Sequence, residues 1–136
     1  MAEEKKYKVL IVDDDDFLLN MYSIKFKKNG LDVYISNNGD DALRKLKEGM
    51  VPDMIILDVV MPGMDGFELL EKIRQQKLAE KAFVLILSNQ GQTSDINRAK
   101  ELGVQGYIVK ASTIPSEVLS EVNKILGVGN KDNLKQ

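Results

Sequence analysis

The stretch MIILDVVMPGMDG, residues 54–66, joins a short apolar run to a turn-rich loop. The run from Met54 to Leu57 lacks polar alternation, which is typical of a strand covered by helices on both faces of a parallel sheet. Asp58 follows the run directly, and Pro and Gly residues follow Asp58. The sequence therefore predicts that one carboxylate stands at the carboxyl end of a buried strand, where open α/β sheets bind ligands.

A short apolar run followed by a longer amphipathic segment occurs five times along the chain. This pattern predicts an α/β fold of five βα units, a (βα)5 doubly wound parallel sheet with the flavodoxin-like strand order 2-1-3-4-5. We expect strands at residues 8–12, 31–36, 53–57, 83–87 and 106–109. We expect helices at residues 16–29, 66–75, 94–102 and 115–126. A further helix, between the second and third strands, is expected to begin after Asn38, which can act as its N-cap.

The length of 136 residues suits one domain, which we place at residues 1–126, with a short polar tail at residues 127–136 and no output domain. A net charge of -2 gives no general attraction for nucleic acid, so direct DNA binding is not expected. The apolar run at residues 9–12 is too brief for a signal peptide or a membrane span, so we expect a cytoplasmic protein.

The chain contains no Cys and no His. This composition excludes disulfides, thiolate metal sites, imidazole bases and the usual zinc sites. Any metal must therefore be bound through oxygen, which favours hard cations such as Mg²⁺, Mn²⁺ or Ca²⁺.

Four consecutive aspartates, Asp13 to Asp16, follow the first predicted strand. Such a run is commonly structural, because Asp is a favoured helix N-cap and stabilises a first helical turn. Capping needs only one or two of them, however, and a divalent cation would relieve the repulsion among four. If the first and third strands are neighbours, Asp13, Asp14 and Asp58 converge and form an oxygen site suited to Mg²⁺. The same negative charge disfavours a flavin phosphate at this edge.

Ser88 and Lys110 stand at the ends of the fourth and fifth predicted strands. Each has an ordinary alternative reading, Ser88 as a loop residue and Lys110 as a surface lysine. With neighbouring strands, however, a carboxylate, a hydroxyl and an ammonium surround one point. A phosphoryl group on Asp58 would require this set.

Taken together, these residues resemble the receiver domain of bacterial response regulators, including the single-domain chemotaxis type. The resemblance covers about residues 6–126. It rests on the acidic pair Asp13 and Asp14, the segment at residues 58–66, the hydroxyl of Ser88 and the segment at residues 106–110.

The resemblance implies that Asp58 accepts a phosphoryl group from a histidine kinase or a phosphotransfer protein. It further implies that Asp14, Asp58 and the Val60 backbone carbonyl bind Mg²⁺ or Mn²⁺, with Asp13 acting mostly through water. Lys110 and Ser88 would contact phosphoryl oxygens. In this reading the protein is a phosphoacceptor and not an enzyme, although it takes part in its own phosphotransfer and autodephosphorylation.

The resemblance further implies that Ser88 and the aromatic residue Tyr107 change conformation when Asp58 is phosphorylated. They would remodel the face formed by residues 94–102, 106–109 and 115–126, which would bind a downstream protein. The protein would then be a monomer or a phosphorylation-dependent dimer. Tyr107 also has the ordinary reading of a half-buried packing residue on an edge strand.

The chain departs from the family pattern after Lys110, where Ala111 replaces the usual proline. A cis bond costs about 2.5 to 4 kcal/mol before Ala against about 0.5 to 1 kcal/mol before Pro. We therefore expect either a trans bond with an altered loop or a strained cis bond. In the family, small residues are common at the position of Asn89, and the positions of Val60 and Gln90 influence water access to the phosphoryl group. The bulk and polarity of the residues found here predict slow hydrolysis of a phosphorylated Asp58.

Three functions remain open on the sequence. The first is a phospho-accepting signalling switch that acts through partner binding. The second is an interaction module of the same fold that needs no phosphorylation, which the change at Ala111 permits. The third, a flavodoxin-like enzyme, is disfavoured by the aspartates and by the absence of glycine-rich nucleotide loops.

Overall fold

A computed structural model describes residues 6–89 and 91–127 of the chain. The strands are β1 (Lys8–Val12), β2 (Asp32–Ser36), β3 (Met54–Leu57), β4 (Phe83–Ser88) and β5 (Gly106–Val109). The helices are α1 (Asp16–Lys28), α2 (Gly39–Lys47), α3 (Gly66–Gln75), α4 (Thr93–Glu101) and α5 (Pro115–Leu126). A 3₁₀ turn, η1 (Lys110–Ser112), joins β5 to α5.

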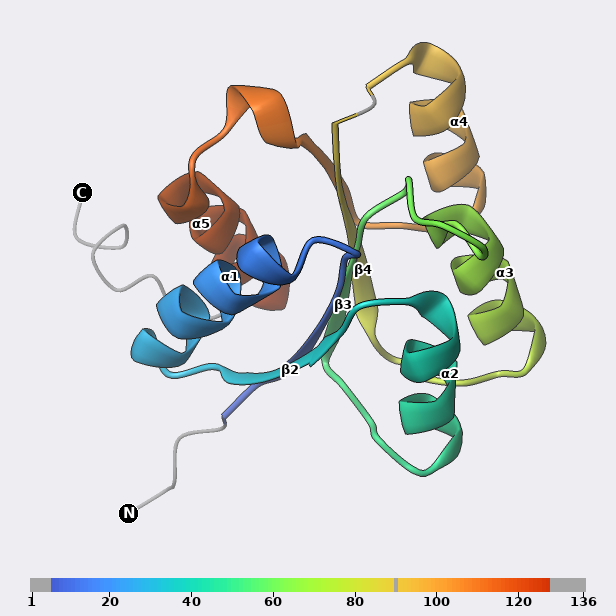
Figure 1. Ribbon diagram of the computed structural model, residues 1–136, viewed down its shortest axis with the longest axis horizontal. Coiled ribbons are helices and arrows are strands. Elements are labelled where there is room, and N and C mark those ends of the chain that lie inside the picture. The colour runs from blue at the N-terminus through green and yellow to red at the C-terminus, as the bar shows by residue number, and fades with distance from the viewer. Residues whose placement is uncertain (1–5, 90, 128–136) are drawn as a thin grey trace.

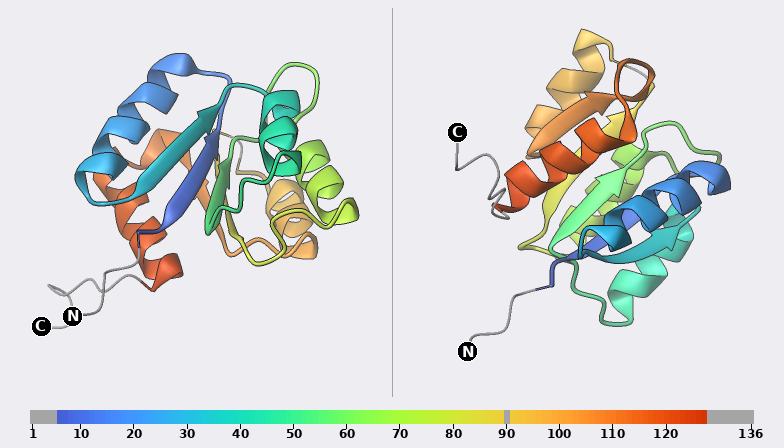
Figure 2. Two further views of the ribbon diagram at one scale, coloured as in Figure 1. Left: turned by 90° about the horizontal axis from the view of Figure 1, so that it is seen from below. Right: turned by 90° about the vertical axis from the view of Figure 1, so that its left-hand side faces the viewer.

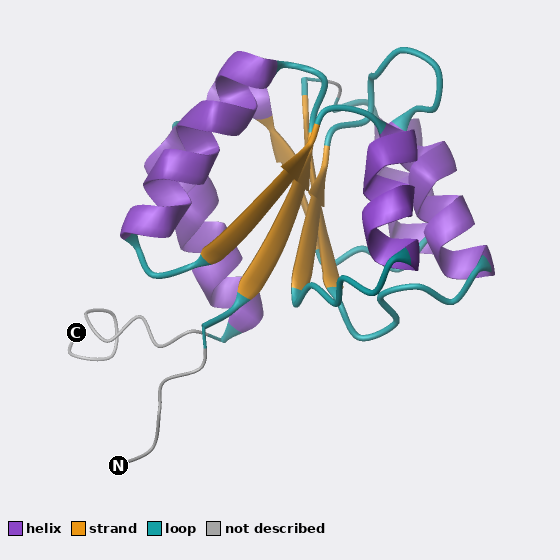
Figure 3. Cartoon of the chain, turned by 60° about the horizontal axis from the view of Figure 1, so that its bottom comes forward, coloured by secondary structure: helices purple, strands orange, loops and turns teal. Residues whose placement is uncertain are grey.

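The strands form one parallel sheet in the order β2-β1-β3-β4-β5, which confirms the predicted topology. Helices α1 and α5 cover one face of the sheet, and α2, α3 and α4 cover the other (Figure 1). The two helical layers and the sheet between them are seen edge-on in Figure 3. Helices α1 and α5 contact each other and lie side by side in the right-hand view of Figure 2.

Each face of the sheet has its own apolar core. The core under α1 and α5 includes Ile11, Phe26 and Val122, while the core under α2, α3 and α4 includes Leu57 and Leu70. Every residue of β3 is buried, because this strand is central and is covered on both sides. The unbroken apolar run that the sequence shows at residues 54–57 follows from this position.

Polar side chains cap the first turns of α1 and α2. Asn38 caps α2, since its side chain accepts a hydrogen bond of 2.7 Å from the backbone N–H of Asp41. Asp15 caps α1 by accepting from the N–H groups of Phe17 and Leu18. Of the four consecutive aspartates, Asp15 therefore has the helix-capping role that such runs commonly have.

The structure differs from the predicted boundaries by one residue at several ends. Strands β2 and β3 begin one residue later than expected, β4 ends one residue later, α1 ends one residue earlier, and α4 is shifted by one residue. The turn η1 was not expected. Its Lys110–Ala111 peptide bond is trans, so the first of the two alternatives for this loop is the one observed. The predicted tail lies outside the described residues beyond Gly127.

No helix within residues 6–89 and 91–127 combines the length and the apolar character that a membrane span requires.

Candidate functional site

The register of β1 against β3 brings two of the predicted carboxylates together. Val12 pairs with Leu57, so the next residues, Asp13 and Asp58, leave adjacent strands side by side. The backbone N–H of Asp58 donates to the Val12 carbonyl over 2.9 Å and extends the pairing by one step. Both aspartates are buried, with 4% of Asp13 and 6% of Asp58 exposed.

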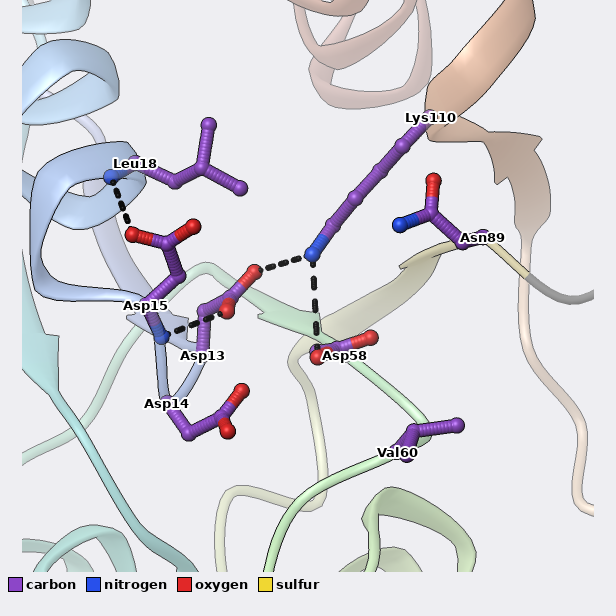
Figure 4. Close-up of a pocket in the computed structure, with 8 residues that line it drawn as sticks. All are labelled: Asp13, Asp14, Asp15, Leu18, Asp58, Val60, Asn89 and Lys110. Carbon is purple, nitrogen blue, oxygen red and sulfur yellow. Dashed lines mark hydrogen bonds and ion pairs between the residues drawn. The ribbon is translucent and has the colours of Figure 1, made fainter.

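A cavity of about 600 Å³ opens at this edge of the sheet. It is lined by residues that follow the carboxyl ends of β1, β3, β4 and β5, including one from the first turn of α1, which are Asp13, Asp14, Asp15, Leu18, Asp58, Val60, Asn89 and Lys110. Figure 4 shows the side chains of Asp13, Asp58 and Lys110 pointing toward one another. The cavity thus lies at the carboxyl ends of the strands, the edge at which the sequence predicts a ligand site.

The Lys110 ammonium bridges the two buried carboxylates. Its Nζ lies 2.6 Å from Asp13 Oδ2 and 3.6 Å from Asp58 Oδ2. Burial alone would lower the pKa of Lys110. The hydrogen bond with Asp13 and the negative charges of Asp13 and Asp58 outweigh burial, so the net effect is a raised pKa. Lys110 therefore stays cationic and is held against Asp13 more closely than against Asp58.

The carboxylate of Asp58 lies in an environment that disfavours its ionisation. Burial and the negative charge of Asp13 raise its pKa to about 6, although Lys110 acts in the opposite direction. An added cation or an electrophilic group would relieve this cost. Asp58 is thus a partly desolvated carboxylate that lines a cavity, and its chemistry allows it to act as an oxygen nucleophile.

The acidic residues of the cavity fit a divalent cation. Asp13, Asp14 and Asp58 each offer an oxygen, and these oxygens lie within 4.8 Å of one another. Asp14 is the exposed member and can reach an ion from the solvent side. An all-oxygen set of this kind suits Mg²⁺ or Mn²⁺, which keep several of their waters.

The loop after β3 folds tightly back on Asp58. Gly66 donates its N–H to the Val59 carbonyl over 2.8 Å, and a side chain at Gly66 would collide with the Asp58 carbonyl oxygen. Asp65 and Glu68 form a capping box at the start of α3, with bonds of 2.8 and 3.1 Å. This loop leaves Val60 on the rim of the cavity with 54% of the residue exposed.

Ser88 and Tyr107 do not line this cavity. Ser88 ends β4 as expected, but it is fully buried. Tyr107 lines a separate cavity of about 120 Å³ between α4 and β5. Burial raises the pKa of Tyr107, as does Asp95, and a hydrogen bond with Ser88 acts in the opposite direction. The two residues assigned to the switch are therefore connected to each other.

Sequence reasoning did not assign Asp15 and Leu18 to the site, yet both line the cavity. Helix α1 begins at Asp16, two residues after Asp14, so its N-cap Asp15 and Leu18 of its first turn reach the wall of the cavity. The early start of the apolar pattern after the aspartate run could have indicated this arrangement.

A family model described as "Response regulator receiver domain" matches residues 9–123. The chain belongs to this family. It is 36% identical over 121 residues to the chemotaxis protein CheY of Bacillus subtilis, and the alignment covers 88% of this chain and 98% of that protein.

The chain also matches part of the sequence of longer regulators. The chain is 35% identical over 119 residues to PhoP of Bacillus subtilis, the alkaline phosphatase synthesis transcriptional regulatory protein, covering 88% of this chain and 48% of that protein. The chain thus spans about half the length of such relatives. Among solved structures, CheY4 of Vibrio cholerae superimposes with a TM-score of 0.81 at 30% identity, covering 88% of this chain and 98% of that one.

Proposed function

We propose that residues 6–126 form a receiver domain that takes a phosphoryl group onto Asp58 from a phosphohistidine of a histidine kinase or phosphotransfer protein. The supporting observation is the arrangement around Asp58, where a partly desolvated carboxylate lies 3.6 Å from the Lys110 ammonium and beside Asp13 and Asp14. These 136 residues contain no His, so the phosphohistidine that donates the group lies outside them.

In the transfer step, an Asp58 oxygen attacks phosphorus as the bond from phosphorus to the donor nitrogen breaks. The electron pair of that bond stays on the donor imidazole. Lys110 can leave its longer contact with Asp58 and pair with a phosphoryl oxygen while Asp13 keeps it oriented at 2.6 Å. Bound Mg²⁺ would add positive charge to the transferring group, and Asp13, Asp14, Asp58 and the Val60 carbonyl would hold it.

Mg²⁺ is expected to stabilise the fold, because the unfolded chain does not assemble the three carboxylates. At ten times the dissociation constant, the free energy of unfolding should rise by about 1.4 kcal/mol. Urea unfolding with and without Mg²⁺ measures this gain. Asp14→Asn should weaken it, whereas Asp40→Asn, an exposed residue of α2, should not. Equal gains in both variants would argue against the metal site.

Phosphoryl uptake itself is tested with a small-molecule phosphodonor and Mg²⁺. Intact mass spectrometry should show the gain of one phosphoryl group in the wild-type protein and none in Asp58→Ala. A wild-type protein that takes up no phosphoryl group, while a receiver domain of known activity does so in parallel, would instead support the phosphorylation-independent interaction module.

Exposed apolar side chains near the cavity support docking of a protein donor. Phe17 is 77% exposed in the first turn of α1, and Ile114 is 59% exposed in the loop after η1. Phe17→Ala is expected to slow transfer from a phosphohistidine protein by about tenfold. Transfer from a small-molecule donor should not change. Val51→Ala is the matched control, since Val51 is 70% exposed but precedes β3 at the opposite edge of the sheet. Equal effects on both donors would contradict the docking role.

Asn89 is exposed and lines the cavity, while Gln90 lies outside the described residues. We expect the Asn89 side chain to restrict water near a phosphorylated Asp58. Asn89→Ala should therefore shorten the lifetime of the phosphorylated protein by about threefold, as the loss of one hydrogen-bonding group suggests. The decay of the phosphorylated mass after removal of the donor measures this lifetime, and an unchanged or longer lifetime would count against the role.

We further propose that the signal leaves through the face of α4, β5 and α5, where Ser88 and Tyr107 would act as the switch. The connection between Tyr107 and Ser88 and the cavity between α4 and β5 support this assignment. A downstream protein, or a second copy after phosphorylation, would bind there. Nothing in the net charge of -2 favours nucleic acid as a direct partner.

A further inference from the structure

The placement of Lys110 depends on the chain that leaves β5. A lysine side chain has four rotatable bonds, so its ammonium reaches a defined point only if its backbone is held. A proline at the position after the lysine would restrict its own backbone φ angle to about −65°. Ala111 imposes no such restriction, and Ala111 is itself exposed. Other groups must therefore hold the backbone around Lys110.

The Thr113 hydroxyl makes the best-placed contact of this kind. It donates to the Val109 carbonyl over 2.9 Å, and the Lys110 carbonyl lies 3.4 Å away as the alternative acceptor. The backbone N–H of Thr113 also donates to the Lys110 carbonyl over 3.2 Å. Thr113 thus closes the turn η1 on the last residue of β5 and on Lys110 itself.

Ser112 makes a weaker version of the same contact. Its hydroxyl donates to the Val109 carbonyl over 3.2 Å, and that bond is exposed to solvent, whereas the bond from Thr113 is partly buried. A hydroxyl bond shielded from water contributes more to the geometry of the loop. The contact from Thr113 is therefore the one that restrains Lys110.

We propose that Thr113 is a positioning residue for Lys110, and that its hydroxyl replaces the restraint that a proline would supply. The proposal rests on the proposed function, since Lys110 acts on a phosphoryl group. It assigns no direct contact with that group to Thr113.

The first test measures phosphorylation by a small-molecule donor at saturating Mg²⁺. Thr113→Val keeps the side-chain shape without the hydroxyl and should lower the maximal rate by about tenfold, the equivalent of about 1.4 kcal/mol for one hydrogen bond. The donor concentration for half-maximal rate should change little. Thr113→Ser should restore the rate, and Ser116→Ala, an exposed residue of α5, serves as the control.

A double-mutant cycle separates positioning from general stability. In a Lys110→Ala background, Thr113→Val should have no further effect, because the group it positions is gone. An equal loss in both backgrounds, a failure of Thr113→Ser to restore the rate, or an unchanged rate in Thr113→Val would each overturn the proposal. If the wild-type protein takes up no phosphoryl group, the proposed function fails instead.

The second test needs neither phosphate nor metal. An amine-acylating reagent should modify Lys110 slowly, because its side chain is 12% exposed and is paired with Asp13. Peptide mass spectrometry should show several-fold faster acylation of Lys110 in Thr113→Val. Lys45 is the internal control, since it is 25% exposed and paired with Asp41 at 2.6 Å. Unchanged acylation of Lys110, or equal acceleration at Lys45, would overturn the positioning role whatever the phosphorylation result.

Discussion

Replacing Lys110 by alanine is expected to lower the rate of phosphoryl transfer to Asp58 by about a hundredfold to a thousandfold, the range for removal of one preorganised charge-stabilising group. Lys110 is the cation nearest to Asp58 among the described residues, and its ammonium lies 3.6 Å from Asp58 Oδ2. Without it, a divalent cation bound by the carboxylates would have to balance the negative charge on the transferring group alone. The buried Asp13 also loses its partner.

The rate should be measured with a small-molecule donor at saturating Mg²⁺, after circular dichroism has shown that the variant is folded. Lys124→Ala removes an exposed lysine from α5 and should leave the rate unchanged. Lys110→Arg keeps the charge but not the point-like ammonium, so it should recover only part of the rate. A rate for Lys110→Ala within threefold of the wild type would contradict the assigned role.

Replacing Asp58 by asparagine is expected to stabilise the fold by about 3 kcal/mol near pH 8 in the absence of Mg²⁺. The pKa of Asp58 is raised from 3.8 to about 6, so its ionised form is disfavoured in the folded protein. At about 1.4 kcal/mol per pKa unit, the shift corresponds to about 3 kcal/mol. Asparagine occupies the same space without the charge and avoids this cost.

The stabilisation should depend on pH in a defined direction. Because the pKa of Asp58 is higher in the folded protein, protonation of Asp58 favours folding. This contribution to wild-type stability is complete below about pH 4 and is lost as the pH rises through about 6. The advantage of Asp58→Asn should therefore be absent near pH 4 and largest above pH 7.

Urea unfolding at several pH values with a chelator present measures the difference. Glu80→Gln removes one carboxylate from an exposed loop residue and should leave stability nearly unchanged at every pH. Asp58→Asn that destabilises the protein near pH 8, or that differs from the wild type equally at all pH values, would show that Asp58 is not strained by its surroundings.

The strand order of the sheet and the proximity of Asp13 to Asp58 could both be predicted from the sequence, because both follow from local patterns. Unbroken apolar runs mark buried parallel strands, and neighbouring parallel strands end at the same edge. Strand ends were displaced by one residue, as at Ser88, since pairing with Val109 extends β4 beyond its apolar run.

The details of the site depend on side-chain contacts that no local pattern encodes. Lys110 meets Asp13 across a separation of 97 residues, at 2.6 Å against 3.6 Å for Asp58, and no local pattern predicts which carboxylate it approaches more closely. Ser88 is fully buried and shares a hydrogen bond with Tyr107, and its position at a strand end could not reveal this. The turn η1 is held by a hydrogen bond from the Thr113 hydroxyl to the Val109 backbone carbonyl, and such side-chain bonds to the backbone favour a turn over an irregular loop.

The most direct test of the account is to locate the phosphoryl group. The protein is incubated with a small-molecule phosphodonor and Mg²⁺, and borohydride then reduces the acyl phosphate of the modified aspartate to homoserine. Peptide mass spectrometry should find homoserine at Asp58 only in the sample that received both donor and Mg²⁺. An unreduced Asp58, or homoserine at Asp13 or Asp14 instead, would contradict the assignment of Asp58 as the phosphoryl acceptor.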